Sequence, residues 1–120
     1  MKILIVEDET PLLEALSTKL SGAGHDICIA KDGVEGVTTA FSERPDIVLL
    51  DIKMPRKDGL QMLKELREGE WGKEVRVIVL TNLNDPEHIA DMLEAGANEY
   101  LVKTEWKLNE LLDHLVEKVS

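Results

Sequence analysis

The chain has 120 residues, 43% of them hydrophobic and 32% charged, which predicts one globular domain spanning residues 1–120. Its 24 acidic and 14 basic residues give a formal net charge of -10, which disfavours direct binding to nucleic acid and favours cations and basic partners. Cys28 is the only cysteine and excludes an internal disulfide, and no apolar run approaches the roughly 20 residues of a membrane span, so we expect a cytoplasmic domain outside the membrane.

The first part of the chain predicts a strand, a helix and a second strand. Residues 3–6 are a short apolar run, which is typical of a strand buried on both faces. Thr10 as N-cap and Pro11 as first helical residue predict the start of a helix that ends at residues 22–24. Residues 25–30 predict a second strand, whose polar beginning indicates the edge of a sheet.

The middle of the chain repeats this pattern. Asp32 and Glu35 form a variant of the capping box and predict a second helix, which Pro45 ends. We expect this helix to bury Val34, Val37 and Phe41. Residues 47–50 are uniformly apolar and predict the third strand, and residues 51–59 predict a loop.

The remaining half predicts three helices and two strands, at residues 75–80 and 100–102. Asp85 and Pro86 open the fourth helix, and Thr104 caps the fifth. The residues expected to face inward are Leu60, Leu63 and Leu66 in the third helix, Ile89, Ala90 and Leu93 in the fourth, and Leu108, Leu111, Leu112, Leu115 and Val119 in the fifth.

Five strands thus alternate with five helices, which predicts an α/β fold with a parallel sheet covered on both faces. We expect a flavodoxin-like, doubly wound sheet with the strand order 2-1-3-4-5. In such a sheet the first and third strands flank the point where the strand order reverses. Ligands bind in the crevice that opens there, at the carboxyl ends of the strands.

Four of the predicted strands end in polar side chains: Glu7 and Asp8 after the first, Asp51 after the third, Thr81 after the fourth and Lys103 after the fifth. Because the carboxyl ends of parallel strands meet at one edge, we expect these side chains to lie together. Asp8 and Asp51 are hard oxygen ligands suited to Mg²⁺, and Glu7 could hold a metal-bound water. A phosphoryl group would also meet Lys103 and Thr81, and Asp51 could attack its phosphorus to give an acyl phosphate.

With these strand ends the chain resembles, over essentially its whole length, the receiver domain of two-component response regulators. The resemblance rests on Glu7-Asp8, the stretch Asp51-Ile52-Lys53-Met54-Pro55-Arg56-Lys57-Asp58-Gly59, Thr81, Gly96-Ala97, Tyr100 and Lys103. It implies a phosphorylation-activated signalling switch, in which Asp51 accepts a phosphoryl group from a histidine kinase or phosphotransfer protein in a Mg²⁺-dependent reaction. Such a domain promotes its own phosphorylation and dephosphorylation but turns over no external substrate.

The resemblance also implies a role for each matching position. The implied metal ligands are Glu7 (through water), Asp8, Asp51 and the backbone carbonyl of Lys53. Thr81 and Lys103 would contact the phosphoryl group. Inward movement of Thr81 would couple to rotation of Tyr100 and alter the face made by the fourth helix, fifth strand and fifth helix, to which an unknown downstream protein would bind.

Three departures from the family's pattern stand out, and one of them is that Lys53 and Leu83 occupy positions which, in the family, influence how long the phosphoryl group survives. Thr104 follows Lys103 where the family usually has proline, often after a cis peptide. A cis bond before any other residue costs about 2.5–4 kcal/mol, so we expect a trans peptide here. Asn82 stands where the family usually has a small residue after Thr81, and this larger side chain would narrow access for small phosphodonors or attacking water.

Other functions fit parts of the pattern. A haloacid-dehalogenase-type phosphatase would have a second Asp where this chain has Lys53, and a flavodoxin-like cofactor protein would need a loop rich in Ser, Thr and Gly where residues 7–9 are acidic. The alternative that stays open is a phosphorylation-independent docking module. Trp106 is either an exposed anchor for a partner or folds over a helix end. We expect a monomer and leave open a dimer that forms on phosphorylation.

Overall fold

The computed structural model describes residues 1–52, 58–82 and 86–119. In it, strands and helices alternate along the chain, as the sequence predicts. The strands are β1 (Lys2–Val6), β2 (Asp26–Ala30), β3 (Ile47–Leu50), β4 (Arg76–Thr81) and β5 (Glu99–Val102). The helices are α1 (Thr10–Gly22), α2 (Gly33–Glu43), α3 (Gly59–Glu68), α4 (Pro86–Glu94) and α5 (Leu108–Val119). Two short 3-10 helices, η1 (Trp71–Lys73) and η2 (Lys103–Glu105), follow α3 and β5. None of the helices in these ranges has the length and apolar composition of a membrane-spanning segment.

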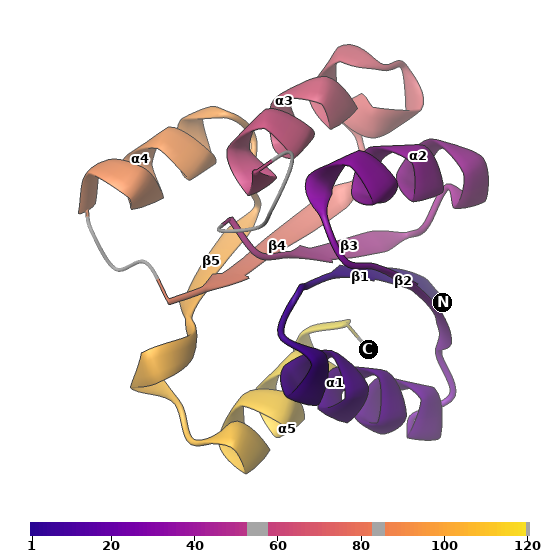
Figure 1. Cartoon of the computed structure of the whole chain (residues 1–120), viewed down its shortest axis with the longest axis vertical. Helices are drawn as coiled ribbons and strands as arrows, with labels where there is room; N and C mark the ends of the chain where they lie inside the picture. The colour runs from indigo at the N-terminus through magenta and orange to yellow at the C-terminus, as the bar shows by residue number, and fades with distance from the viewer. Residues whose placement is uncertain (53–57, 83–85, 120) are drawn as a thin grey trace.

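The strands form one parallel sheet in the order β2-β1-β3-β4-β5, which confirms the predicted topology. Helices α1 and α5 cover one face of the sheet, and α2, α3 and α4 cover the other (Figure 1). Strand β1 pairs with β2 on one side and with β3 on the other, so the strand order reverses between β1 and β3. The crevice of this fold class therefore lies where β1 and β3 end.

The two halves of the hydrophobic core lie on opposite faces of the sheet. Along β1, Ile3 and Ile5 pack with α1 and α5, whereas Leu4 and Val6 pack with α2 and α3. All four side chains are at most 1% exposed. A strand that is buried on both faces has no polar position in its middle, which is why β1 and β3 are recognisable in the sequence as uniformly apolar runs.

Two helix starts differ from the prediction. Glu9, not Thr10, is the N-cap of α1, and Thr10 is the first helical residue. Thr104 does not cap α5 but lies in η2, because the chain makes a 3-10 turn after β5 and begins the helix only at Leu108. Leu108 consequently is 53% exposed instead of facing inward. The described residues contain no cis peptide, so the peptide between Lys103 and Thr104 is trans, as expected.

Helix α2 packs through its small residues. The prediction that Val34 and Phe41 are buried is wrong, since they are 40% and 38% exposed. Instead Gly33, Gly36 and Ala40 are buried, and α2 lies so close to α3 that a Cβ at Gly36 would be 2.6 Å from the sulfur of Met62. The larger side chains are displaced to the flanks of the helix, where Phe41 makes an edge-to-face contact with Trp71.

The prediction of which α4 residues face inward is also wrong in part. Met92 is the buried residue of this helix, Ile89 is half-buried, and Ala90 and Leu93 are exposed. The reason is the position of α4, which packs on the edge strand β5 and on α3 instead of the centre of the sheet. A helix at an edge buries a narrower stripe than its apolar residues suggest.

Arg67, near the end of α3, forms hydrogen bonds at the edge of the sheet opposite the crevice. Its guanidinium donates hydrogen bonds to the carbonyl oxygens of Gly72 at 2.7 Å, Val75 at 2.6 Å and Gly96 at 2.6 Å, and to Oδ1 of Asn98 at 3.2 Å. Burial lowers the pKa of this guanidinium. One side chain thus ties together the segments that enter β4 and β5.

Candidate functional site

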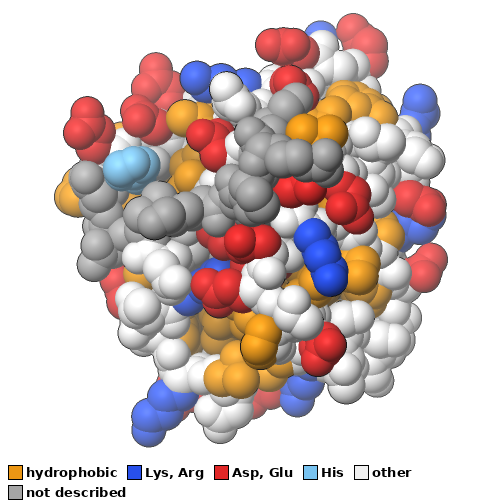
Figure 2. All heavy atoms as spheres, viewed as in Figure 1, with side chains coloured by type: hydrophobic (Ala, Val, Ile, Leu, Met, Phe, Trp, Pro, Cys, Tyr) orange, Lys and Arg blue, Asp and Glu red, His pale blue; other side chains and the backbone are white. Residues whose placement is uncertain are grey.

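The parallel sheet brings the predicted site residues to one edge. Strand β1 ends at Val6 and β3 at Leu50, and these two residues are paired in register. The ladder continues for one more step, because the backbone N–H of Asp51 donates to the carbonyl of Val6 at 3.0 Å. Glu7, Asp8 and Asp51 therefore leave the sheet side by side. Figure 2, drawn in the same view as Figure 1, shows acidic side chains gathered near the middle of the visible surface.

Glu7, Asp8 and Asp51 form a candidate metal site. Each offers one carboxylate oxygen, and the three oxygens lie within 4.8 Å of one another. Glu7 and Asp51 are buried, at 2% and 5% exposure, whereas Asp8 faces solvent. Carboxylate oxygens that converge at this spacing fit a hard divalent cation such as Mg²⁺, which usually retains several waters. Lys53, the fourth predicted ligand, lies outside the described residues.

Lys103 forms ion pairs with two of these carboxylates, those of Glu7 and Asp51. It follows β5 in η2, and its side chain is 7% exposed. Its ammonium nitrogen lies 2.6 Å from Oε1 of Glu7 and 3.2 Å from Oδ2 of Asp51. A weaker ion pair, at 3.8 Å, joins it to Glu9. The structure thus places the Lys103 ammonium next to Asp51, the predicted nucleophile.

The site carries more negative charge than one ammonium can neutralise. Burial raises the pKa of Glu7 to about 7, and the negative charge of Asp51 adds to this, although the hydrogen bond from Lys103 opposes it. Burial lowers the pKa of Lys103, but its hydrogen bond to Glu7 and the charges of Asp51 and Glu9 outweigh burial and hold the pKa above its ordinary value. An excess of carboxylates explains both shifts, because it favours any bound proton or cation.

Thr81 and Tyr100 lie on neighbouring strands. Thr81 is the last residue of β4, 1% exposed, and pairs in register with Val102 of β5. Tyr100 is half-buried, pairs with Val79 and packs against the core on the α2–α3–α4 face. Because side chains alternate along a strand, Thr81 and Tyr100 belong to the same face of the sheet. Thr81 lies at the edge where Asp51 and Lys103 meet, and Tyr100 lies further from it.

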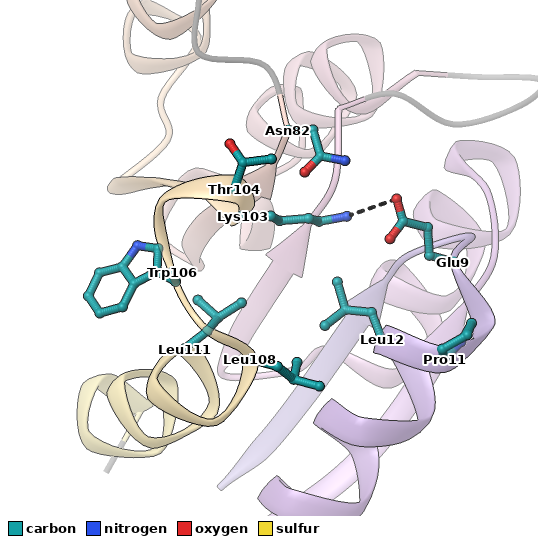
Figure 3. A pocket seen from close by; sticks show the side chains of 9 residues that line it. All are labelled: Glu9, Pro11, Leu12, Asn82, Lys103, Thr104, Trp106, Leu108 and Leu111. Atoms are coloured by element: carbon teal, nitrogen blue, oxygen red, sulfur yellow. Dashed lines mark ion pairs between the residues drawn. The ribbon is translucent and has the colours of Figure 1, made fainter.

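A cavity of about 310 Å³, which no sequence pattern predicts, opens beside Lys103 (Figure 3). Its lining residues come from the start of α1, the end of β4 and the segment from η2 into α5: Glu9, Pro11, Leu12, Asn82, Lys103, Thr104, Trp106, Leu108 and Leu111. Trp106 is half-buried and stacks on His114, with ring centroids 4.6 Å apart. Trp106 thus folds over the beginning of α5 and forms part of a wall, instead of standing free as an anchor.

The comparisons with known proteins agree with this geometry. The family model of the response regulator receiver domain matches residues 3–116. The chain belongs to this family. The receiver domain is 39% identical over 112 residues to the response regulator MprA of Mycobacterium avium, covering 93% of this chain and 48% of that protein. It therefore spans about half the length of the curated relatives that it matches.

Solved receiver structures are similar over nearly the whole chain. The chemotaxis protein CheY4 of Vibrio cholerae has a TM-score of 0.86 at 29% identity, with 99% of this chain and 98% of that chain covered. The receiver domain of the sensor histidine kinase PA1611 of Pseudomonas aeruginosa has a TM-score of 0.83 at 31% identity, with 98% and 94% covered, and holds a magnesium ion in its active-site cleft. Membership of this family assigns the receiver domain to two-component signalling.

Proposed function

We propose that this receiver domain is a phosphorylation-activated switch, in which Asp51 accepts a phosphoryl group from a phosphohistidine of a histidine kinase or phosphotransfer protein. The observation that carries the proposal is the convergence of two acidic strand ends on one lysine: Lys103 lies 3.2 Å from Asp51 and 2.6 Å from Glu7. The magnesium ion in the cleft of the PA1611 receiver domain supports the same use of the acidic cluster here.

Glu7, Asp8 and Asp51 would hold Mg²⁺, together with the backbone carbonyl of Lys53. The bound cation supplies positive charge for the oxygens of the incoming phosphoryl group. A carboxylate oxygen of Asp51 forms a bond to phosphorus while the P–N bond of the phosphohistidine breaks. The electron pair of that bond leaves with the imidazole nitrogen, which takes a proton from water. The product is an acyl phosphate on Asp51.

Lys103 and Thr81 would receive the phosphoryl group. The Lys103 ammonium already lies beside the nucleophile, so it can pair with a phosphoryl oxygen without a large rearrangement. Thr81 brings a hydroxyl donor at the end of β4. Because these two residues and the bound cation would stabilise the phosphoryl group both while it is transferred to Asp51 and while it is lost, we infer that they promote phosphorylation of Asp51 and hydrolysis of the acyl phosphate by water.

The signal would leave through the α4–β5–α5 face. Phosphorylation adds negative charge at the edge of the sheet and favours an inward position of Thr81. Thr81 and Tyr100 belong to the same face of the sheet, on neighbouring strands, so a shift of Thr81 can change the room available to the Tyr100 ring. The downstream partner would bind one of the two arrangements more tightly and thereby shift the population between them.

Intact-mass spectrometry of the chain treated with phosphoramidate, a small donor with a P–N bond, tests this function. We expect the mass of one phosphoryl group to be added when Mg²⁺ is present, little addition in its absence, and none in Asp51→Asn. Asp58→Asn is the matched control, because Asp58 caps α3 through the N–H of Gln61 and asparagine caps a helix equally well. An adduct in Asp51→Asn would contradict the site. No adduct in either the unmodified chain or Asn82→Ala, which removes the side chain expected to narrow access for small donors, would favour the phosphorylation-independent docking module.

A further inference from the structure

Glu9 has an unusual position for a helix cap. It is the N-cap residue of α1, where a polar side chain normally accepts a hydrogen bond from the first turn of the helix. The Glu9 side chain makes no such bond. It points across the mouth of the cavity toward Lys103 instead, and the two charged groups lie 3.8 Å apart (Figure 3). The Glu9 side chain therefore forms an ion pair with Lys103 instead of a capping hydrogen bond to α1.

The carboxylates that pair with Lys103 differ in whether they also belong to the candidate metal site. The three carboxylates near its ammonium are those of Glu7, Asp51 and Glu9. Glu7 and Asp51 belong to the cluster that fits a divalent cation, and Glu9 does not. An ammonium and a divalent cation compete for the same carboxylate oxygens, because each is stabilised by their negative charge. Among the carboxylates that the structure places at Lys103, Glu9 alone stays available when a cation takes the other two.

We propose that Glu9 is a positioning residue, which holds the Lys103 ammonium at the mouth of the cavity while a divalent cation occupies the Glu7–Asp51 side. This inference rests on the proposed function, because it concerns how that site accepts its metal. It has two consequences. The cation binds more tightly because the displaced ammonium keeps an anionic partner, and Lys103 stays within reach of a phosphoryl group on Asp51.

Glu9 reaches Lys103 from the solvent side. Glu9 is half exposed, at 50%, whereas Lys103 is 7% exposed, so the pair spans the boundary between the buried site and water. The backbone N–H of Glu9 also donates to Oε2 of Glu7 at 3.2 Å, which leaves Oε1 of Glu7 directed at Lys103. A single residue thus fixes Glu7 through its backbone and offers Lys103 an alternative partner through its side chain.

Calorimetric titration of Mg²⁺ into the full chain tests the inference in a double-mutant cycle. The variants are Glu9→Gln, Lys103→Met and the double variant, with Glu14→Gln as the control that removes one exposed charge from the same helix without touching Lys103. Exposed and half-exposed ion pairs contribute up to about 1 kcal/mol, so we expect Glu9→Gln to weaken Mg²⁺ binding by about fivefold. In the Lys103→Met background the same change should weaken it by about twofold or less, and Glu14→Gln should have an effect below about twofold.

The competing explanation, in which Glu9 only adds negative charge to the field around the cation, makes the opposite prediction. Without the screening ammonium, Glu9→Gln would then weaken Mg²⁺ binding as much in the Lys103→Met background as in the unmodified chain, or more. Equal or larger effects there overturn the role of Glu9 alone. No Mg²⁺ binding by the unmodified chain overturns both this inference and the proposed function. If Lys103→Met does not fold, Lys103→Gln completes the cycle.

Nuclear magnetic resonance of the lysine ammonium groups gives a second readout that a merely structural role of Glu9 would not change. With Mg²⁺ bound, the Lys103 ammonium should remain visible through slow hydrogen exchange in the unmodified chain and lose this protection in Glu9→Gln. Lys103→Met assigns the signal. Equal protection in both proteins at saturating Mg²⁺ would show that Glu9 does not hold the ammonium.

Discussion

The excess of carboxylates at the site predicts that the metal-free domain loses stability as the pH rises, and that Glu7 causes this loss. Glu7 is 2% exposed, and the lysine that faces it at 2.6 Å also serves Asp51. Burial raises its pKa from 4.5 to about 7. The folded state therefore binds a proton that the unfolded state has already lost between these two pH values. Folding stability is greatest below pH 4.5 for this group and falls as the pH rises through 7.

The size of the effect follows from the shift. One pKa unit corresponds to about 1.4 kcal/mol, so the full effect is about 3 kcal/mol, of which about 2 kcal/mol falls between about pH 5.5 and about pH 8. Glu7→Gln keeps the shape of the side chain and removes its charge. We expect this variant to be more stable than the unmodified chain at pH 8, with the advantage shrinking toward pH 5.5.

Urea denaturation in the presence of a chelator, measured at several pH values, provides the test. The two proteins differ at residue 7 alone, so the difference between the two stability curves isolates Glu7. Glu14→Gln is the control for net charge, because Glu14 is exposed on α1. Parallel curves for the unmodified chain and Glu7→Gln would refute the reasoning, and so would an advantage of the variant that grows toward low pH.

Two further predictions concern the edge of the sheet opposite the site. Arg67→Met should lower the free energy of unfolding by about 2–3 kcal/mol, because it leaves three carbonyls without a charged donor, whereas Lys64→Met on the same helix should change it by less than about 0.5 kcal/mol in the same urea titrations. Gly96 has φ = 108°, and a Cβ there would be 2.8 Å from Nε of Arg67, so Gly96→Ala should cost about 2 kcal/mol of stability. Gly22→Ala, where a Cβ meets nothing within 4 Å, should instead stabilise the helix by up to about 1 kcal/mol, and thermal unfolding that ranks the two glycine variants the other way would contradict this argument.

The sequence predicted the fold and the place of the site because both depend on strong, repeated patterns. Strands buried on both faces must be apolar throughout, as β1 and β3 are, and parallel connection by helices then brings every strand end to the same edge. The carboxylates of Glu7, Asp8 and Asp51 could be assigned to one cluster on that basis alone, and their mutual distances confirm it. The roles assigned to Thr81 and Tyr100 stay predictions.

Features that depend on how two segments approach each other were not predictable in this way. The inward face of α2 is set by Gly36, whose missing side chain admits Met62, and an apolar pattern gives no weight to a glycine. The ion pair of Glu9 involves Lys103, the first residue of a 3-10 turn, whereas the sequence pattern predicts that a helix begins at Thr104. The acidic run at residues 7–9 was the available signal, but it assigned no role to Glu9 beside Glu7 and Asp8, the two residues predicted to bind the metal.

The charge of the site links its stability to its function. Uncompensated negative charge in a cluster of carboxylates raises their pKa, and the same uncompensated charge favours binding of a divalent cation. A proton and the proposed metal ion would therefore be alternative ligands of Glu7, and each would compensate the cost of burying it at 2% exposure. Replacing the cluster by neutral side chains would remove that cost and, in the proposed function, the ability to receive a phosphoryl group. In the proposed function, the destabilising contribution of Glu7 in the metal-free domain is thus a direct consequence of a site that binds a cation beside Asp51.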